Sequence, residues 1–153
     1  MAISIALSAA ILILIGVLLT RRPREQSFTV AVAAPIAEQV TGLAARSAEF
    51  LAILRDRGLD LNAPRQIDLH FVANTERSAK DLMRSLRSEF PGSKLELSRS
   101  DPADSMRPPW RVTCVVQAPV SAIVQPPAIE HRVRVATSVG AVHDGWGTAV
   151  DKR

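Results

Sequence analysis

The fold is decided by residues 66–90, QIDLHFVANTERSAKDLMRSLRSEF, in which two hydrophobic periods follow one another. Apolar residues first occupy every second position: Ile67, Leu69 and Phe71. They then recur at steps of three and four: Ala79, Leu82, Met83, Leu86 and Phe90. The first period predicts a strand at 66–73 with one buried face, and the second predicts an amphipathic helix. Asn74 or Thr75 is suited to cap that helix, and the Pro-Gly pair at 91–92 is suited to end it.

A second unit of the same kind follows along the chain. The segment KLELSRS at 94–100 predicts a strand with its two leucines inward, and a polar turn with three prolines fills 101–109. The segment 110–120 is apolar on both faces in its middle, as expected for a central strand. We expect the last helix at about 127–140, with proline in its first turn, and a closing strand at 142–150. The apolar stripe of that helix is Ile129, Val133, Ala136 and Val139.

The order strand, helix, strand, strand, helix, strand predicts the fold class. Two strand-helix-strand units with right-handed crossovers, joined by a hairpin, form a four-stranded antiparallel sheet. We therefore expect an α+β protein of ferredoxin-like architecture with its helices packed on one face. Another amphipathic helix is predicted at 36–57, before the first strand, with Gly58 as a left-handed C-cap. Its inward stripe is Ile36, Val40, Leu43, Ala44, Ser47, Phe50, Leu51 and Leu54.

The N-terminal segment is predicted to cross a membrane. Residues 2–20, AISIALSAAILILIGVLLT, carry no charge and are long enough as a helix to span roughly 30 Å of hydrocarbon. A cleaved signal peptide has its basic residues before the apolar run, whereas RRPR at 21–24 follows it, so we expect an uncleaved anchor. Because Lys and Arg stay on the cytoplasmic side, the rest of the chain is expected at the inner face of the cytoplasmic membrane. Residues 21–35 are expected to form a linker whose further role stays open.

The net charge of +4 does not indicate a nucleic-acid binder. Without the three arginines of RRPR, 16 of the 19 basic side chains remain against 15 acidic ones. The chain has no tyrosine, and its few aromatic residues form no pattern of a base-stacking platform. We therefore expect no direct nucleic-acid partner. The single cysteine also excludes a disulfide within the chain.

No catalytic or metal-binding pattern emerges from the sequence. The three histidines lack ligand spacing, and we expect His70 on a strand and His131 and His143 at the surface. Cys114 is expected in the core of the central strand, because no cysteine-enzyme signature surrounds it. Phosphate-binding glycine loops and a Gly-x-Ser-x-Gly motif are absent. We expect no catalytic residue, no metal, no cofactor and no small-molecule substrate. A hydrolytic enzyme, as a third hypothesis, would depend on Cys114 or His70.

The helix that begins near residue 75 carries a basic stripe. Its four members recur at steps of three and four, which places them on one helix face: Arg77, Lys80, Arg84 and Arg87. Such a stripe suits an acidic protein, RNA phosphate or anionic lipid. The competing interpretation is an ordinary solvated face, since three acidic residues flank it: Glu76, Asp81 and Glu89.

The chain closes on HDGWGT at 143–148. Asp144-Gly145 is a typical turn pair, and the glycines on both sides of Trp146 allow close passage of the backbone while the indole packs. Two interpretations stay open for this segment. Either the indole locks the last strand onto the sheet, or Asp144, Gly145 and Trp146 form an exposed recognition element.

This closing segment resembles the corresponding motif of a known family, regulator of ribonuclease E activity B (RraB). Residues 58–74, GLDLNAPRQIDLHFVAN, are similar to the turn and strand of that family, and residues 78–97 are similar to its following helix and strand. The resemblance covers about 40–149. It implies a ferredoxin-like domain, at 36–153 in this chain, that binds ribonuclease E and lowers its cleavage of RNA as a protein inhibitor without catalytic activity.

Two functions follow as expectations. The first is a membrane-anchored RraB-like domain that binds ribonuclease E and modulates RNA turnover, where tethering raises the effective concentration near a membrane-associated partner. The alternative is a membrane-anchored adaptor for another membrane protein or anionic lipid. The expected partner-binding residues are those of the basic stripe and of the closing motif: Arg77, Lys80, Arg84, Arg87, Asp144, Gly145 and Trp146.

Overall fold

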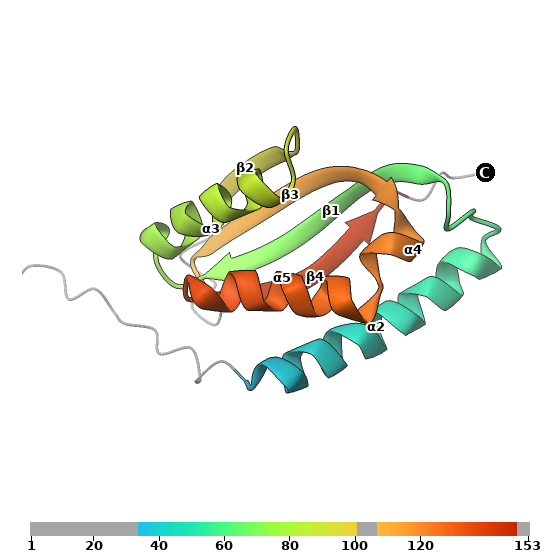
Figure 1. Ribbon diagram of the computed structural model, residues 1–153, viewed down its shortest axis with the longest axis horizontal. Coiled ribbons are helices and arrows are strands. Elements are labelled where there is room, and N and C mark those ends of the chain that lie inside the picture. Colours follow the sequence, from blue (N-terminus) through green and yellow to red (C-terminus); the bar gives the residue numbers. More distant parts are fainter. Residues whose placement is uncertain (1–33, 101–106, 150–153) are drawn as a thin grey trace, which may run out of the picture.

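The computed structural model describes residues 34–100 and 107–149 of the chain (Figure 1). The elements in chain order are α2 (Ile36–Asp56), β1 (Pro64–Ala73), α3 (Glu76–Glu89), β2 (Lys94–Arg99), β3 (Trp110–Pro119), α4 (Val120–Ile123), α5 (Pro126–Ser138) and β4 (Ala141–Thr148). Most of them lie within two residues of the predicted bounds. Thr75 is the cap of α3, since its side chain accepts a hydrogen bond from the backbone N–H of Ser78.

The four strands form one sheet in the order β2-β3-β1-β4, and every neighbouring pair is antiparallel. This confirms the predicted α+β class with a four-stranded antiparallel sheet. The element order β-α-β-β-α-β, from β1 to β4, is that of a ferredoxin-like unit, to which α2 and α4 are added. β1 and β3 are central, while β2 and β4 form the two edges.

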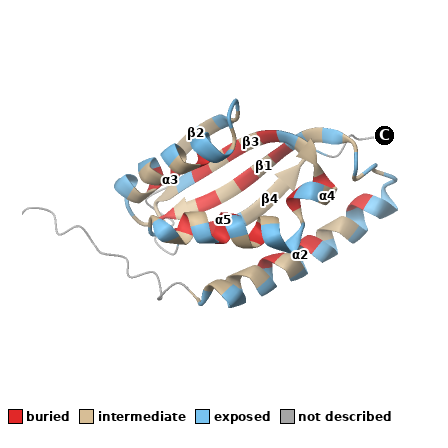
Figure 2. Cartoon of the chain, in the orientation of Figure 1, coloured by how far each residue is buried: buried red, intermediate tan, exposed pale blue. Residues whose placement is uncertain are grey.

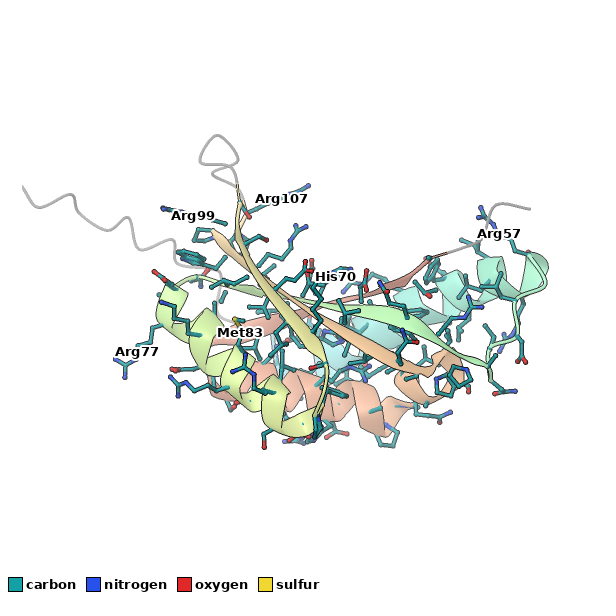
Figure 3. The ribbon with its side chains drawn as sticks, turned by 90° about the horizontal axis from the view of Figure 1, so that it is seen from above. Arg57, His70, Arg77, Met83, Arg99 and Arg107 are labelled. Carbon is teal, nitrogen blue, oxygen red and sulfur yellow. The ribbon has the colours of Figure 1, made fainter. Side chains whose placement is uncertain are left out.

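The helices cover one face of the sheet (Figure 1). Along β1 every second side chain is buried against them, namely Ile67, Leu69, Phe71 and Ala73, and on β3 the buried set is Val112, Cys114 and Val116. Figure 2 shows the same buried positions on the strands and on the facing sides of α3 and α5. His70 lies on the opposite face of the sheet, away from α3 and α5 (Figure 3). Cys114 is a core residue of a central strand, as predicted.

Helix α2 lies beside α5 and joins two parts of the core. Near its start Leu43 packs with Ile129 and Val133 of α5. Near its end Leu54 enters the main core between the sheet and the helices. Gly58 follows with a φ of 72°, the left-handed backbone that the sequence predicts at the C-cap. The predicted inward stripe of this helix is therefore correct.

One short element was absent from the predictions. We expect a strand up to residue 120, but the chain turns into α4 at Val120. Pro119 has no N–H to donate, which ends the strand pairing. The N–H of Ser121 then donates to the carbonyl of Leu61 at 3.0 Å, which fixes this turn against the segment before β1.

Within residues 34–100 and 107–149, no helix combines the length and apolar character needed to cross a membrane. The predicted anchor at 2–20 lies outside the described residues, and so does the predicted linker at 21–35 apart from its last two residues.

Candidate functional site

The closing motif forms an edge strand with a bulge. In the register of β4 on β1, His143 lies opposite Phe71 and Gly145 lies opposite His70, so Asp144 is an extra residue. Gly145 has a φ of 143°, a backbone conformation that favours glycine. The prediction of a turn at Asp144-Gly145 is therefore wrong, because the pair lies inside β4.

The bulge changes which side chains face the helices. In a regular strand, residues three apart point to opposite faces. Here His143 and Trp146 both lie opposite inward residues of β1, Phe71 and Leu69, and both face the helical layer. The motif therefore directs two large side chains inward and leaves Asp144 exposed between them.

Trp146 attaches α2 to the edge of the sheet. Its ring lies 4.9 Å from that of Phe50, centroid to centroid, at an interplanar angle of 53°. Its Nε1–H donates to Oγ of Ser47 at 2.9 Å, and the Ser47 side chain is buried in α2. Of the two interpretations of Trp146, the structure shows the packed indole. The indole packs against α2 and so connects this helix to the last strand.

A hollow of about 160 Å³ lies between α2 and β4. Its lining comes from four residues of α2 and three of the closing motif: Leu43, Arg46, Ser47, Phe50, Asp144, Gly145 and Trp146. Leucine and aromatic side chains supply its apolar part, while Arg46 and Asp144 are exposed and carry opposite charges. The hollow thus combines an apolar surface with charges that a protein partner can contact.

The structure also contains a buried polar network that was not predicted from the sequence. Arg132 of α5 is 3% exposed and His143 is 2% exposed. Arg132 donates through Nε to Nε2 of His143 at 3.3 Å and through Nη2 to the carbonyl of Ile123 at 2.6 Å. His143 in turn donates through Nδ1 to the carbonyl of His70 at 3.1 Å, which fixes the tautomer that leaves Nε2 free to accept.

The predicted surface position of His143 is wrong, because the bulge turns this side chain toward the core. Burial, together with the nearby Arg132 guanidinium, lowers the pKa of His143 to about 3. Burial also lowers the pKa of Arg132 to about 10. A sequence signal for Arg132 exists: it lies between Ile129, Val133 and Ala136 on the apolar stripe of α5.

The predicted basic stripe lies on the exposed face of α3 and does not reach the hollow. Three of its members pair with acidic residues of the same helix: Lys80 with Glu76 at 2.6 Å, Arg77 with Asp81 at 4.0 Å, and Arg84 with Asp81. The Arg77 side chain is 94% exposed and points away from α3 (Figure 3). The structure therefore places the two predicted sets of site residues on different parts of the surface.

Catalytic and metal-binding arrangements do not appear in the described part of the chain. No group of three or more His, Cys, Asp or Glu residues there is placed to hold a metal ion. Cys114 is buried, and its burial raises the pKa of the thiol. Its neighbour in the register on β1 is Leu69, so Cys114 and His70 point to opposite faces of the sheet. The two residues on which the hydrolytic hypothesis depends are thus not brought together.

A family model described as regulator of ribonuclease activity B (RraB) matches residues 44–148, more than half of the chain. The chain belongs to the RraB family. The match spans the sheet from β1 to β4 and most of α2, so the contacts of Trp146 with Ser47 and Phe50 lie inside the RraB domain. This confirms the family resemblance of the closing motif. A comparison with curated proteins gave no significant match.

Proposed function

We propose that this chain is a membrane-anchored regulator that binds ribonuclease E and lowers its cleavage of RNA. Membership of the RraB family carries the proposal, because the family is described as a regulator of ribonuclease activity. The protein would act by binding, without catalysis, cofactor or metal. The uncharged segment at 2–20 and the basic residues directly after it support a location at the inner face of the cytoplasmic membrane.

The closing motif is the part of the domain that we propose for contact with the ribonuclease. Asp144 is exposed at the bulge, and Gly145 and Trp146 line the hollow beside α2. Anchoring would confine the domain and a membrane-associated partner to one surface, so that a contact of moderate area suffices for binding.

Binding of the full chain, held in detergent micelles, to purified ribonuclease E tests this proposal. The same titration is run against RNA alone and against vesicles of anionic phospholipid, and cleavage of an RNA substrate is followed in parallel. We expect saturable binding to the ribonuclease with slower cleavage, and no saturable binding to RNA. The proposal is contradicted if the chain shows no saturable binding to the ribonuclease and RNA cleavage proceeds at the same rate with and without it.

The exposed basic stripe favours a second candidate, an adaptor for anionic lipid or another membrane protein. Its four cations share one helix face: Arg77, Lys80, Arg84 and Arg87. Replacing all four by Gln would abolish binding to anionic vesicles under this candidate and leave contacts through the closing motif intact. Under the ribonuclease proposal, the same variant keeps its affinity for the ribonuclease.

A further inference from the structure

We propose that the ribonuclease binds as an extended segment, which adds to β4 as a further strand and inserts one apolar side chain into the hollow between α2 and β4. This inference rests on the proposed function and specifies how the partner is recognised. The first observation is the position of β4 at the edge of the sheet (Figure 1).

The outer side of β4 offers backbone hydrogen-bonding groups. Among the described strands, β4 pairs with β1 alone. No backbone hydrogen bond joins its outer side to another segment of residues 34–100 or 107–149. Half of the N–H and C=O groups of an edge strand point outward and suit an added strand. A partner in extended conformation satisfies them, whereas a helix or a lipid headgroup does not.

The hollow lies where a side chain of such a strand would project. Side chains of an added strand alternate between the two faces of the sheet. Those on the helical side would meet the surface formed by Leu43, Phe50 and Trp146. The volume of about 160 Å³ suits one medium-sized apolar side chain and not a folded element. The observed geometry therefore favours a single anchoring residue.

The charges at the rim specify the neighbours of that residue. Arg46 and Asp144 both line the hollow and are exposed, and no ion pair joins them to each other or to another group of the described chain. A segment with an acidic and a basic residue around its apolar anchor would complement both charges. By contrast, three of the four cations of the basic stripe already have acidic partners on α3.

The bulge explains how such an edge remains selective. A bulge and an exposed charge on an edge strand discourage pairing with arbitrary strands. Asp144 supplies both features in β4, as the extra residue of the bulge and as its exposed carboxylate. A strand that offers no counter-charge would leave Asp144 unpaired, so pairing is restricted to a complementary segment.

Amide hydrogen exchange of the full chain in detergent micelles, with and without ribonuclease E, tests the inference. We expect the ribonuclease to slow exchange at outward-facing amides of β4. Arg46→Ala and Asp144→Ala should each weaken ribonuclease binding about tenfold, whereas Arg77→Ala, the matched loss of an exposed charge on α3, should leave it unchanged. Binding that protects no β4 amide, or that responds to Arg77→Ala and not to the rim variants, overturns the strand-addition inference and leaves the proposed function intact. Absence of any binding by the wild-type chain overturns both.

Discussion

The indole N–H of Trp146 donates to the hydroxyl of Ser47 at 2.9 Å across 99 positions of the chain. This bond joins the last strand, β4, to α2, the helix that precedes the first strand, so it connects the first and last elements of the described domain. The ring contact between Trp146 and Phe50 adds apolar area at the same place. The tryptophan of the closing motif thus adds to the contacts with α5 and the core that hold α2 in place, and α2 provides one wall of the hollow.

Removal of the acceptor hydroxyl should destabilise the domain measurably. Ser47→Ala leaves the indole N–H without its partner, and an unsatisfied donor in a partly buried site costs about 1 kcal/mol. Urea unfolding of the full chain measures the change. Ser98→Ala serves as the control, because Ser98 is exposed on β2. Equal unfolding midpoints for both variants would contradict a stabilising role of the bond.

Trp146→Ala should cost more than Ser47→Ala, since it also removes the contact with Phe50. We expect a loss of about 3 kcal/mol, within the range for truncation of large packed side chains. Trp146→Phe keeps a ring against Phe50 and should lose only the contribution of the hydrogen bond. In a double-mutant cycle, Ser47→Ala should then add little to Trp146→Phe. Additive losses would show that the two side chains act independently.

The two glycines of the motif should respond differently to alanine. Gly145 has a φ of 143°, so Gly145→Ala places a side chain in a strained backbone and should cost about 1–3 kcal/mol. A Cβ at Gly147 meets Nε2 of His70 at 3.6 Å, an ordinary contact. Gly147→Ala should therefore be close to neutral. Thermal unfolding of both variants measures the difference, and equal losses would argue against strain at the bulge.

The period of the apolar residues and the helix-capping residues suffice to predict the strands and the main helices. The alternating apolar residues Ile67, Leu69 and Phe71 predict a strand with one buried face. The helical spacing of the segment that follows predicts a helix with one buried face. The structure buries both faces. The family motif also identifies β4 as the closing strand. These features depend on neighbouring residues only, which is why a single sequence reveals them.

The site depends on contacts that no local pattern encodes. The bulge arises from the register of β4 on β1, which the sequence does not show. The Asp144-Gly145 pair by itself is typical of a turn, and the sequence therefore predicts one there. The same register turns His143 inward, toward an arginine on another helix. Arg132 carries a charge within an apolar stripe, and its hydrogen bonds to His143 and to the carbonyl of Ile123 compensate for its burial. The partner of Trp146 likewise comes from α2, almost a hundred residues earlier.

The buried histidine should make stability dependent on pH. Burial and Arg132 lower the pKa of His143 from 6.5 to about 3. Between these values the unfolded chain binds one more proton than the folded protein, so stability falls as the pH decreases through this window. The loss from this residue is about 2 kcal/mol by pH 5 and stops growing below the folded pKa. Urea unfolding from pH 7 to pH 4 measures it.

His143→Gln provides the test variant for this pH dependence, because its side chain offers an acceptor to Arg132 and does not titrate. Its stability should vary less between pH 7 and pH 4 than that of the wild type. His131→Gln, a change at an exposed histidine of α5, should retain most of the wild-type dependence. If His143→Gln keeps the full wild-type slope, the dependence comes from other groups.

Replacement of Arg132 should change both stability and the titration of His143. Arg132→Met removes the donors to His143 Nε2 and to the carbonyl of Ile123, and two acceptors that lose their partners cost about 2–3 kcal/mol in total. The same change removes a nearby positive charge, so the pKa of His143 should rise above about 3 while burial still keeps it below its ordinary value. NMR titration of the His143 ring and urea unfolding at pH 7 measure the two effects. Arg134→Met is the matched control, because Arg134 lies on the same helix in an exposed pair with Glu130 and surface pairs contribute little. An unchanged pKa of His143 in Arg132→Met would show that Arg132 is not needed to keep this histidine neutral, and that burial and the remaining charge of Arg46 are sufficient.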